Sequence, residues 1–226
     1  MKISNKTLSL LQSFAQISSN LLVKPGKKLA TRNAVNSIQA RAIVDETFPQ
    51  QFAIYDLNQL LSLISVSQNP DVEFGDKSLT IRSENGGEIE YFYADESLIT
   101  SPNENAPPLE DIYTFKLTGN DIQTIIKTAS IVSATMLNIV SEKGKVTLSI
   151  NDPKNSTSHS YKKPLGDAET SFNVKMSIDS FKVVADEYNV RVAYVIGKSG
   201  KTLVFFFEST SSDLTYLIAA DSSSKV

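Results

Sequence analysis

The sequence predicts an α+β protein made of two similar halves, and three observations support this prediction. A short strand, an amphipathic helix, a hairpin, a strand-to-helix step and further strands occur in the same order twice along the 226 residues. A proline-rich polar segment, residues 97–112, lies near the middle of the chain. The composition, 41% hydrophobic and 21% charged, is that of a globular protein that can bury a core without disulfides or metals.

The first half is predicted to begin with a short strand at residues 2–3 and a helix that Ser4 caps, since apolar residues then recur at a helical period. A hairpin is expected over residues 20–28, with its turn at Pro25-Gly26. Asp56 is positioned to cap a second helix, which carries Leu57, Leu60, Leu61 and Ile64. The other strands are expected at residues 52–54, 72–74, 79–82 and 88–93.

The second half repeats this order. Thr118 is positioned to cap a helix with apolar residues from Ile122 to Ala129, and Lys143-Gly144 predicts the turn of a hairpin. Ser177 is positioned to cap a fourth helix, which would bury Ile178, Phe181, Val184 and Ala185 on one side. The hairpin is expected over residues 137–150, and the other strands at residues 113–117, 172–176, 190–196, 202–208 and 214–220.

Each half therefore reads as duplicated β-α-β units, with two helices and antiparallel sheets. We expect two domains, residues 1–108 and 109–226, with a connector at about residues 97–112. Proline removes backbone donors and restricts the chain, so this connector is expected to be extended rather than part of a core.

Residue types that most enzymes need are missing from the sequence. Cysteine is absent, and the single histidine, His159, lies in a polar segment without a second imidazole. Paired carboxylates such as Asp186 and Glu187 lack an apolar pocket that would raise a pKa for acid–base chemistry. We therefore expect no enzyme, no metal and no cofactor. No apolar run approaches a membrane span of about 18–20 residues, and no signal peptide is evident, so a soluble intracellular protein without a membrane partner is expected.

One segment, GKSGKT at residues 197–202, ends like a phosphate-binding P-loop. The full motif needs a glycine five positions before Gly200, where this chain has Val195, and it must join a strand to a helix. Strand-like residues stand on both sides here, so a hairpin turn is favoured over a nucleotide hydrolase.

Charge is distributed unevenly along the chain, although the net charge is only −3. Residues 1–44 contain seven lysines and arginines and no acidic residue, whereas residues 45–111 contain fourteen acidic residues against two basic ones. This pattern allows one face to approach phosphates while the rest of the protein stays acidic. Scattered surface charge is the plain alternative.

The outward faces of three of the four predicted helices are small and polar, with few lysines and no acidic residue, whereas the face of the fourth, after Ser177, departs from this pattern. In chain order they are Lys2, Lys6, Ser9, Ser13 and Gln16; Asn58, Gln59, Ser62 and Ser65; Asn120, Gln123, Thr124 and Lys127; and Asp179, Lys182 and Asp186. They lack the Arg, Asn and Gln spacing that reads bases, but they suit weak, sequence-independent contact with a phosphate backbone.

Four segments carry a family resemblance: MKISNKTLSLLQSFAQISSNLLVKPGKKLATRN, FAIYDLNQLLSLIS, the proline-rich connector and TYLIAAD. Through them the chain resembles the sliding clamps of T-even-type bacteriophages, which are DNA polymerase processivity factors and fold relatives of proliferating cell nuclear antigen. The resemblance runs the whole length and depends on the order of segments, because clamps have no catalytic signature.

The resemblance implies the DNA clamp fold and a homotrimeric ring around duplex DNA, with helices lining the hole and sheets outside. The partners it implies are duplex DNA without sequence preference, the replicative DNA polymerase, a clamp loader and a late sigma-like factor, with a further role in late transcription. It implies action in viral DNA replication, in the cytoplasm of the infected host cell.

Two sets of residues are candidates under this resemblance. The DNA-facing set is Lys2, Lys6, Lys24, Lys27, Lys28, Arg32, Lys127 and Lys182. Asp179 and Asp186 weaken the case for Lys182. The set for a pocket that takes a polymerase peptide is Leu109, Ile112, Phe115, Leu217, Ala219 and Ala220. Each of these apolar residues is equally well explained as packing between connector and core.

Two other functions stay open from the sequence. One is a two-module structural or assembly protein of a virion that does not encircle DNA. The other is the nucleotide hydrolase, which the missing P-loop glycine argues against.

Overall fold

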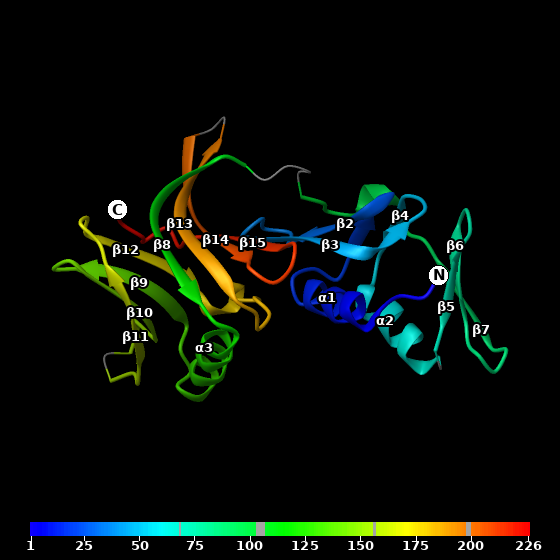
Figure 1. Cartoon of the computed structure of the whole chain (residues 1–226), viewed down its shortest axis with the longest axis horizontal. Helices are drawn as coiled ribbons and strands as arrows, with labels where there is room; N and C mark the ends of the chain where they lie inside the picture. Colours follow the sequence, from blue (N-terminus) through cyan, green and yellow to red (C-terminus); the bar gives the residue numbers. More distant parts are fainter. Residues whose placement is uncertain (68, 103–106, 156, 198–199) are drawn as a thin grey trace. The chain divides into compact units, whose positions relative to one another are not determined.

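A computed structural model describes residues 1–67, 69–102, 107–155, 157–197 and 200–226 (Figure 1). The chain forms two compact units, Met1–Glu104 and Asn105–Val226. The predicted boundary between residues 108 and 109 stays a prediction.

Unit 1 contains two α-helices and short antiparallel sheets. Its elements are α1 (Asn5–Ala15), β1 (Leu21–Val23), β2 (Gly26–Arg32), β3 (Ile38–Phe48), β4 (Phe52–Ile54), α2 (Leu57–Val66), β5 (Asp71–Phe74), β6 (Ser78–Arg82), β7 (Glu88–Phe92) and the 3₁₀ turn η1 (Glu96–Leu98). β1 pairs with β4, β2 pairs with β3, and β5, β6 and β7 form a sheet in that order.

Both helices of unit 1 begin where their caps predict. The Ser4 hydroxyl accepts a hydrogen bond from the Thr7 backbone N–H at 3.2 Å, and the Asp56 carboxylate accepts one from the Gln59 N–H at 3.0 Å. The helices lie side by side, and their apolar faces bury Phe14 and Leu57 completely (Figure 1). Their polar faces are therefore directed away from the core.

The start of unit 1 differs from the prediction at two places. Residues 2–3 form no strand; Met1 and Val72 exchange two hydrogen bonds through their main-chain atoms, and α1 begins soon afterwards. The predicted hairpin over residues 20–28 is wrong, because β1 pairs with β4 and β2 pairs with β3. Pro25 has no N–H for a cross-strand bond, and Gly26 has a φ of 109°, which redirects the chain between the two sheets.

The described residues of unit 2 form one α-helix and eight strands, four in each of two antiparallel sheets. Its elements are β8 (Leu109–Leu117), α3 (Gly119–Ile131), β9 (Met136–Glu142), β10 (Lys145–Asn151), β11 (Tyr161–Asp167), β12 (Phe172–Ser177), the 3₁₀ turn η2 (Ile178–Ser180), β13 (Tyr188–Gly197), β14 (Gly200–Ser209) and β15 (Leu214–Ala219). The strand orders are β11-β10-β9-β12 and β15-β14-β13-β8.

Local signals of unit 2 are confirmed at α3 and at the β9–β10 hairpin. Thr118 and Asp121 form a reciprocal capping box at the start of α3. Lys143 and Gly144 have φ values of 52° and 79°, as a two-residue turn between twisted strands requires. Residues 109–112 already belong to β8, so the end of the expected connector is part of a sheet.

The predicted fourth helix is wrong. Ser177 caps only the 3₁₀ turn η2, and the chain from Phe181 onward is irregular. Phe181 and Val183 are both buried while Lys182 between them is exposed. An α-helix has 3.6 residues per turn, so it cannot bury every second residue and expose the one between. The two adjacent valines, Val183 and Val184, disfavour a helix further. The described part of unit 2 therefore has one α-helix where the sequence predicts two.

The GKSGKT segment joins β13 to β14, and Gly197 lies opposite Gly200 in the register. Residues 198–199 of this predicted turn lie outside the described residues. A strand follows Gly200, so the strand-to-helix context of a P-loop is not met.

Candidate nucleic-acid interface

The exposed faces of the three described α-helices are mostly polar and nearly free of acidic residues, although Val66 of α2 and Ile126 and Ile131 of α3 are exposed as well. Asn58, Gln59, Ser62 and Ser65 are exposed on α2, as predicted, and Gln123 is exposed on α3. Ser13 of α1 differs from the prediction: it is buried, and its hydroxyl donates to the Leu10 carbonyl at 2.7 Å. Asp121 is the one acidic residue within the described helices.

Two predicted DNA-facing lysines lie on these helices. Lys6 of α1 and Lys127 of α3 are exposed, and neither forms an ion pair with a described acidic residue. Lys2 is exposed just before α1. Lys182 is exposed as well, but it follows the 3₁₀ turn η2 instead of lying on a helix. A phosphate group can reach all four without first breaking an ion pair to a described residue.

The other four candidates belong to or flank β2, not a helix. Lys27 and Lys28 are exposed on this strand, and Lys24 precedes it. Arg32 ends the strand, and its guanidinium donates to the Asn36 side-chain oxygen at 3.4 Å. The structure thus places two of the eight predicted residues on α-helices and four on or next to β2, while Lys2 and Lys182 lie outside both.

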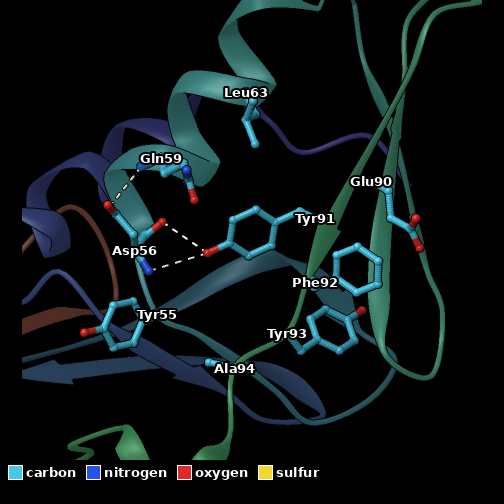
Figure 2. Close-up of a pocket in the computed structure, with 9 residues that line it drawn as sticks. All are labelled: Tyr55, Asp56, Gln59, Leu63, Glu90, Tyr91, Phe92, Tyr93 and Ala94. Carbon is cyan, nitrogen blue, oxygen red and sulfur yellow. Dashed lines mark hydrogen bonds between the residues drawn. The ribbon is translucent and has the colours of Figure 1, made fainter.

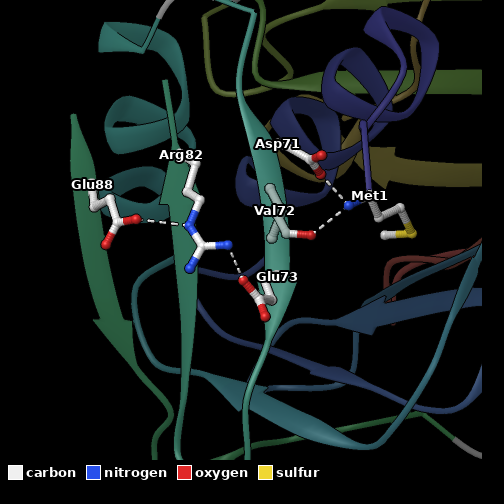
Figure 3. A network of polar contacts seen from close by, with 6 residues as sticks. All are labelled: Met1, Asp71, Val72, Glu73, Arg82 and Glu88. Atoms are coloured by element: carbon white, nitrogen blue, oxygen red, sulfur yellow. Dashed lines mark hydrogen bonds and ion pairs between the residues drawn. The ribbon is translucent and has the colours of Figure 1, made fainter. Parts of the chain in front are cut away.

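The sheet formed by β5, β6 and β7 has the opposite charge. Its strands carry four acidic residues and one basic residue, Arg82, whose contacts with Glu73 and Glu88 are drawn in Figure 3. Arg82 bonds the Glu88 carboxylate at 2.8 Å and also pairs with Glu73; these contacts raise the pKa of Arg82. The amino group of Met1 bonds the carboxylate of Asp71 on the same sheet. The positive charge of Arg82 is thereby neutralised, and the sheet disfavours contact with phosphates.

The predicted peptide-pocket residues lie on two strands of one sheet that are not adjacent. Leu109, Ile112 and Phe115 belong to β8, whereas Leu217 and Ala219 belong to β15. Ala220 directly follows β15 and donates its N–H to the Leu203 carbonyl. β13 and β14 separate the two groups, so roughly 14 Å lies between them at the usual strand spacing.

Phe115 and Leu217 also lie on different faces of this sheet. Phe115 is opposite Val190 and Phe207 in the register, and it is buried with its ring 6.0 Å from Tyr113. Leu217 is opposite Phe206, one residue out of phase with Phe207, so it lies on the other face. The structure therefore brings Leu217 and Ala219 together on one face, and it places Phe115 in the interior.

Unit 1 also has an aromatic pocket of about 430 Å³ that the sequence interpretation missed (Figure 2). It lies between α2 and β7, and Tyr55, with 64% of its surface exposed, is part of its lining. The Tyr91 hydroxyl donates to the Asp56 carbonyl at 3.3 Å, which ties the pocket to the start of α2. In the sequence, the signal for this pocket would have been an aromatic residue, Tyr55, directly before the helix cap Asp56.

The described residues contain no group of three or more His, Cys, Asp and Glu side chains that could hold a metal ion. Among the helices of these residues, none has the length and apolar character to cross a membrane.

Comparison with known proteins agrees with the fold. No protein-family model matches the chain. It is 27% identical over 199 residues to the sliding clamp of Vibrio phage KVP40, covering 85% of this chain and 90% of that protein. It is 27% identical over 231 residues to the sliding clamp of Enterobacteria phage T4, covering 98% of each.

A solved structure supports the same conclusion. PCNA from Thermococcus kodakaraensis superposes with a TM-score of 0.66 at 12% identity, covering 96% of each chain. This is a sliding-clamp fold. The similarity to the phage sliding clamps spans almost the entire chain, and the clamp-fold units of this protein contain the helices with the lysine-bearing polar faces.

Proposed function

We propose that this chain is a DNA polymerase sliding clamp, a ring-shaped processivity factor that encircles duplex DNA and tethers the replicative polymerase during viral DNA replication. The observation that carries the proposal is the whole-length similarity to phage sliding clamps, together with the clamp fold. In this role the protein is a binding protein rather than an enzyme, and it acts in the cytoplasm of the infected host cell.

The ring is proposed to be a homotrimer with six similar half-subunits. Rotational symmetry of this kind joins unlike surfaces head to tail, so each chain contributes two different interfaces. A clamp loader opens one such interface to admit DNA. The duplicated halves of the chain supply the approximate sixfold repeat.

Ring closure explains why the helices carry so few positive charges. A protein that surrounds DNA does not need tight binding, because topology prevents escape. Each phosphate contact adds affinity and salt dependence, and tight contacts would slow sliding. We propose that Lys2, Lys6, Lys127 and Lys182 guide the DNA, with Lys24, Lys27, Lys28 and Arg32 at the rim.

Polymerase tethering is proposed to use an apolar peptide that docks on the face of β15 that carries Leu217. Leu217 and Ala219 share this face, and Ala220 follows them. Leu109 and Ile112 of β8 are proposed to extend the docking surface, and Phe115 to support it from the core. Late transcription through a late sigma-like factor would use the same tether. By holding a partner near DNA, the clamp converts dissociation into local rebinding.

The test uses DNA topology. The full chain is loaded with its clamp loader and ATP onto nicked circular DNA, and the complex is separated by gel filtration at moderate salt. We expect retention on the circle and loss after the circle is cut to a linear form. Light scattering is expected to give about three times 24.8 kDa. Equal retention on circular and linear DNA, or a monomer at every concentration, would contradict the proposal.

The docking surface is tested by Leu217→Asp, with Thr170→Asp as the control, because Thr170 is exposed and lies between β11 and β12, outside the proposed surface. An acid on the proposed apolar surface is expected to abolish most polymerase stimulation while retention on circular DNA is unchanged. Normal stimulation of synthesis on long primed templates by the Leu217 variant would exclude this surface.

A further inference from the structure

Each of the three helices has a carboxylate of this chain bound at its N-terminus. The first N–H groups of a helix and the helix dipole together attract anions, and phosphate above all. In a protein that surrounds DNA, such ends would be ready-made sites for backbone phosphates. The described structure places Glu46, Asp56 and Asp121 at these ends instead.

Glu46 reaches α1 from strand β3. Its two carboxylate oxygens accept hydrogen bonds from the Ser4 N–H at 2.6 Å and from the Thr7 hydroxyl at 2.5 Å. Partial burial opposes ionisation, but these hydrogen bonds outweigh it and hold the pKa of Glu46 below its usual value. The charge at the start of α1 is therefore present at neutral pH.

Asp56 and Asp121 belong to the caps themselves. Asp56 is the N-cap of α2 and accepts from the Gln59 N–H, as Figure 2 shows. Asp121 is the third residue of α3; it accepts from the Thr118 N–H at 3.0 Å and pairs with Lys163 at 2.8 Å. The Asp121 carboxylate is also largely buried, yet the bonds from Lys163 and Thr118 keep its pKa lowered.

The three carboxylates come from three different structural positions: a neighbouring strand, an N-cap and a third helical residue. The rest of the described helical residues contain no acidic side chain. Acidic groups thus occur where a helix would hold a phosphate most firmly, and they are absent along the helix bodies.

We infer that Glu46, Asp56 and Asp121 keep DNA phosphates off the backbone N–H groups at the three helix N-termini, so that the helices contact DNA only through polar and lysine side chains, among them Lys6 in the first turn of α1. The inference rests on the proposed function, because it assumes that DNA passes along the helices. Its consequence is mechanical: no fixed phosphate site holds the DNA in one position, and the clamp slides with little resistance.

The test is the variant Glu46→Gln/Asp56→Asn/Asp121→Asn in the full chain. These changes keep the shape of each side chain, and asparagine caps helices about as well as aspartate. The matched control is Asp76→Asn/Glu84→Gln/Glu90→Gln, which removes three exposed charges near the β5–β7 sheet. The Lys6→Ala/Lys127→Ala variant is measured in parallel to test the proposed function by itself.

Affinity for a fluorescent 30-base-pair duplex is measured by anisotropy between about 50 and 200 mM salt. We expect the helix-end variant to bind about two- to fivefold more tightly per helix end, with a steeper salt dependence. The control variant is expected to gain less, because its charges lie away from the helix ends. Asp56→Asn alone, the mildest change, is expected to show the same direction if the triple variant is unstable.

Two results would overturn the inference in distinguishable ways. If the lysine variant loses affinity but the helix-end variant matches its control, the carboxylates do not exclude phosphate and the proposed function stands. If neither variant changes affinity, the helices do not contact the duplex and the inference fails, while retention on nicked circular DNA decides the proposed function separately.

Discussion

Helices α1 and α2 and the sheet β5–β6–β7 belong to the same unit, yet they distribute charge in opposite ways. The helices contain one lysine and no acidic residue, whereas the three strands contain four acidic residues and one arginine. Lys6 of α1 has no described ion-pair partner, while Arg82 of the sheet contacts two carboxylates. Net charge therefore says little about which surface meets DNA.

The same two regions also differ in how they use apolar residues. Phe14 of α1 is fully buried against the core, whereas Phe92 at the end of β7 has 66% of its surface exposed. A helix with one buried stripe has a defined outer face, and its polar residues are held in a fixed direction. The sheet instead leaves aromatic surface available next to its acidic residues.

The largest expected effect is on folding, from Phe14→Ala compared with Phe92→Ala. Removing the buried ring leaves a cavity beneath α1, and we expect a loss of about 3–5 kcal/mol in the free energy of unfolding. Removing the exposed ring of Phe92 is expected to change the free energy of unfolding by less than about 0.5 kcal/mol. Urea denaturation followed by circular dichroism measures both. Similar losses in the two variants would show that α1 is not the better-anchored region.

The next largest effect is on DNA association, from Lys6→Glu/Lys127→Glu. Reversing two charges on the helices is expected to lower affinity for linear duplex DNA on the order of tenfold or more, and to reduce the salt slope by about 0.9 per lost phosphate contact. The control with equal charge change is Lys77→Glu/Lys143→Glu, at exposed positions outside the helices. Equal loss in both variants would mean that overall charge, and not the helix surface, governs DNA binding.

Local signals in the sequence predicted much of this arrangement. Ser4, Asp56 and Thr118 each mark a helix start, because a side-chain oxygen that caps a backbone N–H acts within four residues. The Lys143-Gly144 turn is equally local. Such features depend on neighbours in the chain, so they can be read without knowledge of the fold.

Tertiary pairing explains what the sequence interpretation missed. β1 pairs with β4 about thirty residues away, and no turn signal reveals that choice. The segment after Ser177 has a helical spacing of apolar residues, but burial of Phe181 and Val183 in the core overrides it. The carboxylate of Glu46 reaches α1 from a strand 39 residues from Thr7, a distance in sequence at which no spacing rule applies.

The smallest effect concerns pH and again contrasts the helices with the sheet. The pKa of Glu46 is lowered from 4.5, since hydrogen bonds from Thr7 and Ser4 overcome the effect of burial. When folding lowers the pKa of a carboxyl group, the group stabilises the fold at any pH above its pKa in the unfolded chain. This stabilisation is lost as the pH falls through the pKa of the folded state. Glu46→Gln is therefore expected to cost about 1 kcal/mol at pH 7 and progressively less below about pH 4.5.

Glu90→Gln on β7 provides the comparison, because Glu90 is exposed and bonds only the Ser78 hydroxyl among the described residues. The melting temperatures of the parent protein and of the two variants, measured from pH 7 to pH 3, distinguish the contribution of Glu46 from that of Glu90. The Glu46 variant is expected to converge with the parent protein in acid, while the Glu90 variant follows the parent throughout. A constant difference between the Glu46 variant and the parent at every pH would show that the lost contact is steric and not ionic. The charge at the start of α1 would then be dispensable for stability.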